Sequence, residues 1–118
     1  MPLASDPTHV LALLIFFHLL ADYPLQGDFM ARAKNPLHPL PHTPWRLILL
    51  SHATIHGGFV FLATGSLTLA TLELATHHVI DEAKCRGRLT YAQDQALHLA
   101  CKLLWWFAWL TYPVPYTS

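Results

Sequence analysis

Four pairs of histidine or aspartate side chains, each spaced four residues apart, constrain the fold of this chain more than any other feature. The pairs are His18 with Asp22, His52 with His56, His77 with Asp81, and Asp94 with His98. On an α-helix, residues i and i+4 lie on the same face, one turn apart. Because each pair belongs to an apolar segment, the pattern predicts four helices that each direct two polar side chains the same way.

The amino-acid composition favours a lipid environment. Apolar residues make up 53% of the 118 residues and charged residues only 12%, whereas soluble domains usually carry about 25% charged residues. A single domain of this length has too much surface to bury so many apolar side chains. We therefore predict one integral-membrane helical domain over residues 1–118, with the lipid bilayer as its partner; a soluble helical protein with an apolar core is the alternative.

Composition also argues against other classes of protein. The formal net charge is zero and no basic stripe is present, so we expect no nucleic-acid partner. Cys85 and Cys101 form no metal-binding or disulfide pattern, and we expect two free thiols. The segment before Arg32 contains no lysine or arginine and no small-residue cleavage site, so we expect the first apolar run to be retained rather than removed as a signal peptide.

Apolar periodicity and helix-end signals predict an all-α fold, a four-helix transmembrane bundle with a short amphipathic connector after the first helix. Pro24 ends the first helix, and Pro44 precedes the second helix at its first turn. Gly65-Ser66 forms the next turn, and Thr90 is expected to cap the last helix. The expected helices cover residues 8–22, 45–64, 67–85 and 90–112, and the connector lies near residues 27–34.

The basic residues predict how the bundle is oriented. They gather in the first and third loops, namely Arg32, Lys34 and Arg46, and Lys84, Arg86 and Arg88. The positive-inside rule places these loops in the cytoplasm and both termini on the non-cytoplasmic side. All four polar pairs then lie in the cytoplasmic third of the bundle. An aromatic belt is expected at the opposite interface, formed by Trp105, Trp106, Trp109, Tyr112 and Tyr116.

The paired side chains are expected to meet in one polar centre that binds a divalent metal. Ionisable groups at membrane depth cost about 2.5–3.5 kcal/mol each on insertion scales, so they should face one another rather than lipid. Imidazole and carboxylate ligands on facing helices can build a mononuclear or dinuclear site, and a set without thiolate suits zinc, iron or manganese. Such a metal could activate water for hydrolysis. The candidate ligands are His18, Asp22, His52, His56, His77, Asp81, Asp94 and His98.

Three further residues are candidate catalytic groups. Glu73 lies one turn from His77 on the same face, as a general base or as a partner that orients this histidine. Gln95 adjoins a candidate ligand and could orient it. Lys84 could pair with Asp81 or extend to the membrane surface.

Other polar residues have less specific expectations. Gln26, Asp28 and Lys34 follow the first pair and could line the cytoplasmic mouth of the centre. Lys102 lies one turn beyond the last pair, where it could neutralise a buried carboxylate or extend to the surface. The remaining histidines are expected not to be ligands: His9, His38, His42 and His78.

Two other functions remain open. The histidines and aspartates could form a proton or ion relay, which would make the protein a transporter with flux that depends on Asp22 and Asp94. Alternatively, the pairs could be interhelical hydrogen bonds of a structural accessory membrane protein. The sequence identifies no substrate, and a homo-oligomer is compatible with it.

The order of these motifs resembles the DUF3307 family, small multi-pass membrane proteins of bacteria and their phages whose function is unknown. The resemblance is carried by HLLADYPLQ at 18–26, Met30 and Lys34, the His52 segment, HHVIDEAK at 77–84 and DQALH at 94–98. It covers almost the whole chain, and Tyr23 departs from the phenylalanine expected there. It implies location in the bacterial inner membrane and no particular activity. It also implies the importance of His18, Asp22, Gln26, Lys34, His52, His77, Asp81, Lys84, Asp94, Gln95 and His98.

Overall fold

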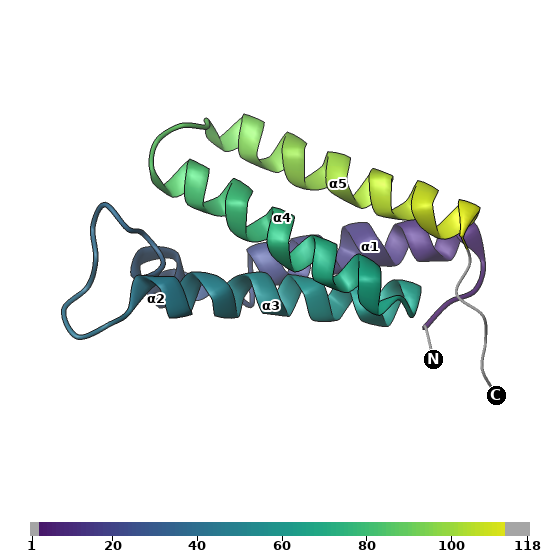
Figure 1. The fold of residues 1–118 in the computed structure, drawn as a ribbon, viewed down its shortest axis with the longest axis horizontal. Helices are drawn as coiled ribbons and strands as arrows, with labels where there is room; N and C mark the ends of the chain where they lie inside the picture. The colour runs from purple at the N-terminus through teal and green to yellow at the C-terminus, as the bar shows by residue number, and fades with distance from the viewer. Residues whose placement is uncertain (1–2, 113–118) are drawn as a thin grey trace.

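The computed structural model describes residues 3–112 and contains, within that range, five α-helices and no strand (Figure 1). The helices are α1 (Pro7–Asp22), α2 (Gly27–Ala33), α3 (Trp45–Thr64), α4 (Leu67–Cys85) and α5 (Tyr91–Thr111). The predicted all-α class is confirmed, and α2 occupies the place of the expected connector. The four long helices begin and end within one residue of the ranges expected from the sequence.

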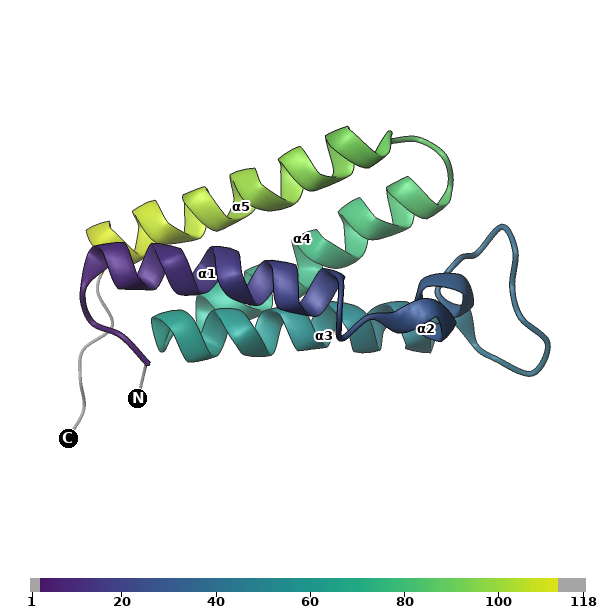
Figure 2. The same cartoon turned by 180° about the vertical axis from the view of Figure 1, so that it is seen from behind.

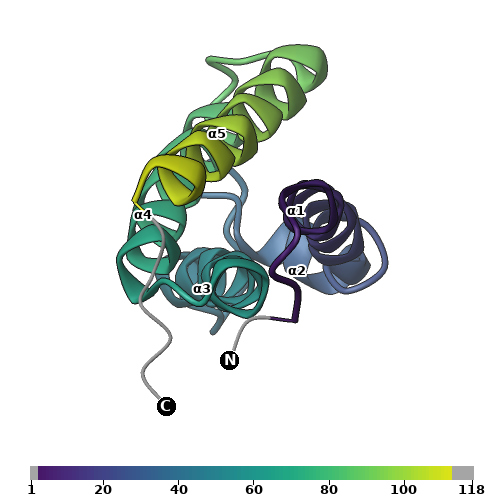
Figure 3. The same cartoon turned by 90° about the vertical axis from the view of Figure 1, so that its right-hand side faces the viewer.

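The long helices form an up-down-up-down bundle. α1 packs on α3 and α5, and α4 packs on the same two helices; Figure 3 shows this arrangement from one end. The α1–α2 turn and the α4–α5 loop lie at one end of the bundle, and the α3–α4 turn lies at the other (Figures 1 and 2). Side chains from all four helices can therefore point into a single core, as in other bundles of this topology.

Local capping fixes where the helices begin and end. The Asp6 carboxylate accepts hydrogen bonds from the backbone N–H groups of Thr8 and His9 at 2.9 and 3.2 Å, before the first turn of α1. Thr90 and Gln93 form a reciprocal capping box at the start of α5. These contacts fix the register of α1 and α5, and hence the faces on which their polar pairs lie.

The core is divided along the bundle axis. Near the α3–α4 turn it is apolar, with a cluster of buried residues that comprises Val10, Leu14, Val60, Ala63, Leu69, Trp105 and Trp109. Toward the α1–α2 turn and the α4–α5 loop, most buried side chains are instead histidine, aspartate, glutamate and lysine, and the buried apolar residues there are Ala21, Ala33, Leu49 and Ala53. The bundle thus encloses a polar centre at one level, as the shared spacing of the pairs predicts.

The predicted aromatic belt is wrong for two of its members. Trp105 and Trp109 are buried in the apolar cluster, and Trp106 donates from Nε1 to the backbone oxygen of Pro7 at 2.9 Å. Tyr116 lies outside the described residues. The tryptophans therefore pack α5 against the rest of the bundle, a role that their position near a helix end does not reveal.

Length and composition support fewer membrane crossings than the predicted four. Within residues 3–112, α3 is the one helix long and apolar enough to cross a membrane alone, and α1 with α2 passes the same test as a pair bent by 80°. The core helix of a soluble protein also passes this test, so the four-helix transmembrane bundle is not confirmed. α4 and α5 fall short because their buried faces carry ionisable groups, Glu73 and Asp81 on α4 and Asp94 and Lys102 on α5.

Gly57 marks a close approach of α3 to α4. A Cβ atom at Gly57 would lie 2.9 Å from the backbone oxygen of Ala70, whereas a Cβ atom at Gly58 would meet no atom within 4 Å. We expect Gly57→Ala to lower the free energy of unfolding by about 1–3 kcal/mol, because the two helices must move apart. Gly58→Ala is the matched control and should be neutral or stabilising by up to about 1 kcal/mol. Equal losses for the two variants in thermal unfolding would contradict this account.

Candidate metal centre

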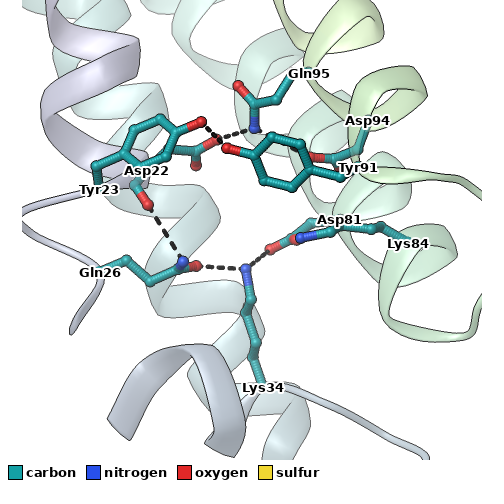
Figure 4. Close-up of a pocket in the computed structure, with 9 residues that line it drawn as sticks. All are labelled: Asp22, Tyr23, Gln26, Lys34, Asp81, Lys84, Tyr91, Asp94 and Gln95. Carbon is teal, nitrogen blue, oxygen red and sulfur yellow. Dashed lines mark hydrogen bonds and ion pairs between the residues drawn. The ribbon is translucent and has the colours of Figure 1, made fainter. Parts of the chain in front are cut away.

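Asp22, the last residue of α1, lies in the middle of the polar centre. Its Oδ1 atom lies 3.1 Å from Nε2 of His52 and 2.9 Å from Nε2 of His56, both on α3. The same oxygen lies 3.8 Å from Nε2 of His77 on α4. Gln95 on α5 donates from Nε2 to the other carboxylate oxygen at 2.9 Å (Figure 4). The Asp22 carboxylate therefore lies within 4 Å of side chains from all three other long helices.

Asp22 and these three histidines form a first group of potential metal ligands. One ligand atom from each residue can be chosen so that all four lie within 4.8 Å of one another. The rings of His56 and His77 are stacked with centroids 3.7 Å apart, and each of the three histidines is at most 1% exposed. Three imidazole nitrogens and one carboxylate oxygen are a donor set that a tetrahedral zinc ion accepts.

Asp94 and His98 on α5 form a second group, which also includes Asp22. Oδ1 of Asp94 lies 3.2 Å from Nε2 of His98, and both residues are buried. The His98 ring stacks on His77 with centroids 4.1 Å apart, which places the two groups side by side. Asp22 is the residue they share, and a carboxylate has two oxygens with which it can contact two ions.

Five buried atoms of these groups lack a hydrogen-bond partner among the described residues: Nδ1 of His52, His56 and His77, Nε2 of His77, and Oδ1 of Asp94. Two of them face other members of the groups, since Nε2 of His77 lies 3.8 Å from Asp22 and Oδ1 of Asp94 lies 3.2 Å from His98. Buried polar atoms in folded proteins are nearly always paired, and leaving one unpaired costs about 1–3 kcal/mol. A metal ion within the two groups would supply the missing partner for Nε2 of His77 and Oδ1 of Asp94, so the donor set fits a bound cation.

A buried ion pair lies behind His77. Glu73 places Oε1 3.5 Å from Nδ1 of His77 and accepts a hydrogen bond from Nζ of Lys102 at 2.5 Å. Its other oxygen accepts from Nε1 of Trp105 at 2.6 Å. A carboxylate on the far nitrogen of a ligand histidine fixes the orientation of its ring. Of the two roles expected for Glu73, this geometry fits the orienting partner, and Lys102 neutralises the carboxylate.

Two of the predicted ligands lie outside both groups. Nε2 of His18 lies 3.0 Å from Oε1 of Gln95, and Oδ2 of Asp81 accepts a hydrogen bond from Nζ of Lys34 at 2.6 Å. Asp81 comes no closer than 3.9 Å to Nε2 of His52. Both side chains are therefore engaged by neighbours. The structure gathers the other predicted ligands: Asp22, His52, His56, His77, Asp94 and His98.

A pocket of about 110 Å³ opens beside the centre, at the end of the bundle that carries the α4–α5 loop (Figure 4). Its lining consists of Asp22, Tyr23, Gln26, Lys34, Asp81, Lys84, Tyr91, Asp94 and Gln95. The hydroxyl groups of Tyr23 and Tyr91 are hydrogen-bonded to each other. This hydrogen bond raises the pKa of Tyr23 to about 12. Two carboxylates of the centre, those of Asp22 and Asp94, thus lie on the wall of this pocket.

Two lysines border the pocket in different ways. Lys34 is buried and donates to Gln26 at 2.5 Å as well as to Asp81. Lys84 lies over the Tyr91 ring, with Nζ 5.2 Å from the ring centroid. The expected alternative of a Lys84–Asp81 pair is therefore not found. In the described part of the chain, Lys84 has no carboxylate partner within 4.0 Å, so it can offer its charge to the pocket.

Gln26, Asp28 and Lys34 were expected at the mouth of the centre. Gln26 and Lys34 line the pocket, but the prediction is wrong for Asp28, which is exposed and pairs with Arg32 at 3.1 Å. Sequence reasoning missed the roles of Tyr23, Tyr91 and Trp105. Spacing offered a signal in two cases: Tyr91 lies one helical turn before Gln95, and Trp105 lies two turns after His98. Tyr23 could be suspected only because it directly follows Asp22, a candidate ligand.

Comparison with known proteins places the chain in one family. No curated protein and no solved structure matches it significantly. The family profile described as "Protein of unknown function (DUF3307)" matches residues 10–115. This range includes every residue of the polar centre and of the pocket beside it. The chain therefore belongs to the DUF3307 family, whose function is unknown.

Proposed function

We propose that this protein is an integral membrane protein that binds divalent metal at the Asp22 centre and uses it to hydrolyse a substrate. The observation that carries the proposal is the convergence of six imidazole and carboxylate side chains from α1, α3, α4 and α5 in two groups that share Asp22. Two of their buried atoms, Nε2 of His77 and Oδ1 of Asp94, have no hydrogen-bond partner among the described residues.

The donor set and the pocket favour hydrolysis. Nitrogen and oxygen ligands without thiolate suit zinc, iron or manganese, and such an ion activates water at neutral pH. Gln95 donates to Asp22 and, at 3.2 Å, to Asp94, and so holds the two carboxylates in place. Lys84 supplies a positive charge at the pocket, and Glu73 orients His77. Each of the predicted catalytic residues thus has a role in positioning ligands or substrate.

The distribution of side chains over the bundle supports a membrane location. The outer face of α5 exposes a row of large apolar residues, namely Leu97, Leu99, Leu103, Leu104, Phe107 and Leu110. The inner face of the same helix buries Asp94, His98 and Lys102. A soluble monomer rarely exposes a wide apolar patch, whereas lipid accommodates such a face and drives ionisable groups inward.

The basic residues support an orientation with the pocket in the cytoplasm. Six of the seven lysines and arginines lie in or beside the α1–α3 connection and the α4–α5 loop; the seventh, Lys102, is buried against Glu73. By the positive-inside rule, that end faces the cytoplasm and both termini face the other side. Because the family is expected in the bacterial inner membrane, the two sides in question are the cytoplasm and the periplasm.

Cysteine labelling tests this orientation. In a background with Cys85→Ser and Cys101→Ser, Pro39→Cys in the exposed α2–α3 loop and Ser5→Cys before α1 each provide one exposed thiol. We expect a membrane-impermeant maleimide to label Ser5→Cys in intact spheroplasts and Pro39→Cys only after lysis, because loops rich in basic residues stay inside. The reverse pattern would contradict the orientation, and recovery of the protein in the soluble fraction would contradict the membrane location.

Metal analysis tests the centre itself. Protein purified in detergent should contain bound zinc, iron or manganese, and His77→Ala should lose most of it because one ligand nitrogen is removed. His78→Ala is the matched control, since His78 is the next residue of α4 and belongs to neither ligand group. Elemental analysis of the three proteins provides the measurement. Wild-type protein that binds no metal, even after incubation with these ions, would contradict the proposal and leave the pairs as interhelical hydrogen bonds.

A further inference from the structure

We infer that the centre holds two divalent ions, an inner ion that organises the bundle and an outer ion that receives an exogenous oxyanion from the pocket. The inner ion is bound by Asp22, His52, His56 and His77, and the outer ion by Asp22, Asp94 and His98. The inference rests on the proposed metal-binding function and deepens it, because it assigns separate tasks to the two ligand groups.

Charge balance in the buried centre calls for cations. Two of the carboxylates that contact it are each matched by a buried lysine, Glu73 by Lys102 and Asp81 by Lys34. Asp22 and Asp94 have no lysine or arginine partner within 4.0 Å in the described part of the chain. Gln95 donates to both, but its amide carries no charge. Two nearby carboxylates buried without a compensating charge are unfavourable, and divalent cations are the natural compensation.

The ligand geometry gives the number of ions. Six residues belong to the two groups, and a tetrahedral ion takes four ligands. Asp94 and His98 do not join the group formed by His52, His56 and His77, although Asp22 joins both. The carboxylate of Asp22 can bridge two ions with one oxygen each, as carboxylates do in two-metal sites of helical bundles.

The two groups differ in how many ligands the protein supplies. The inner group supplies four, which is typical of structural zinc sites, whereas the outer group supplies three, which is typical of catalytic sites that keep one position for water or substrate. The pocket is lined by Asp94 and by the shared Asp22, but by neither His98 nor any of the three inner histidines. Because Asp94 belongs to the outer group alone, an open position on the outer ion would face the pocket, where Lys84 adds a further positive charge.

Cobalt substitution tests the inference on the full chain in detergent. Protein stripped of metal and reloaded with Co²⁺ should bind about two ions per chain, and inorganic phosphate should change only part of the visible absorption. His98→Ala and Asp94→Asn should each bind about one ion and show no change on addition of phosphate, because the inner group is intact. Asp28→Asn alters an exposed carboxylate that pairs with Arg32 and is the control.

The outcomes separate this inference from the proposed function. Two ions with a phosphate-sensitive component in the wild type support the inference, and its loss in the two variants assigns it to the outer group. One ion per chain in the wild type, or two ions with no response to phosphate, overturns the inference and leaves a metal centre in place. No bound Co²⁺ overturns both. Because the wild-type measurement alone decides the number of ions, the test does not depend on either variant folding.

Discussion

Replacing Asp22 with asparagine is expected to deprive the centre of most of its metal. Asp22 belongs to both ligand groups, so Asp22→Asn removes an anionic ligand from each ion while preserving the size of the side chain. Loss of a partner that merely orients a ligand already costs 10–100-fold in affinity, so we expect the affinity for metal to fall by at least about tenfold and the metal retained through purification to fall with it. Metal-dependent hydrolysis of p-nitrophenyl phosphate or acetate should fall to the level of metal-free protein.

The control for this prediction is a carboxylate of the same kind outside the centre. Asp28 on α2 is exposed and pairs with Arg32 at 3.1 Å, so Asp28→Asn should keep the wild-type metal content. Elemental analysis of both variants after purification in the same detergent compares them directly. If Asp22→Asn retained as much metal as Asp28→Asn, Asp22 could not be the shared ligand.

Replacing Lys102 with methionine is expected to be the most destabilising single change in the core. Lys102 is 1% exposed and Glu73 is 0% exposed, with 2.5 Å between Nζ and Oε1. Lys102→Met keeps the length of the side chain but leaves the Glu73 carboxylate buried with the neutral Trp105 as its remaining donor. Breaking a buried ion pair in this way typically costs about 3–5 kcal/mol. Chemical or thermal unfolding in detergent measures the loss.

A second variant shows whether the unpaired charge of Glu73 causes the loss of stability in Lys102→Met. In Glu73→Gln combined with Lys102→Met neither partner of this ion pair is charged, and we expect the double variant to recover at least about half of the loss, since replacing both partners is often nearly neutral. Lys84→Met removes a lysine at the pocket that lies over Tyr91, and should cost less than about 1 kcal/mol. A double variant no more stable than Lys102→Met would mean that packing, rather than charge, accounts for the effect.

Local spacing made much of the fold predictable from the sequence. Each polar pair spans a single helical turn, so its shared face follows from helix geometry alone. Residues such as Pro24 and Thr90 mark helix ends in the sequence. Four helices that each bury one polar face have few ways to pack, and the convergence on a common centre follows from this constraint.

The partners within the centre could not be predicted in the same way. Asp81 pairs with Lys34 rather than with the nearby Lys84 because the 80° bend between α1 and α2 returns the chain toward α3. The burial of Trp105 against Glu73 depends on how α5 packs on α4. Both contacts join residues about thirty or more positions apart in the sequence. No local sequence pattern indicates contacts over such separations.

The number of membrane crossings was harder to predict for a related reason. Each apolar segment with a polar pair was expected to be a span, but buried Glu73 and Lys102 lower the hydropathy of α4 and α5. These two charges compensate each other inside the bundle, which the hydropathy of a single helix does not register. The pairing becomes visible only in three dimensions.

Anomalous X-ray scattering from crystals of the metal-loaded protein tests the central claim most directly. Data collected on either side of the absorption edge of the bound metal locate each ion without reference to the protein. We expect an anomalous peak about 2.0–2.2 Å from an Asp22 oxygen and from Nε2 of His52, His56 and His77. Crystals of protein loaded with zinc, iron or manganese that show no anomalous peak beside Asp22 would contradict the central claim.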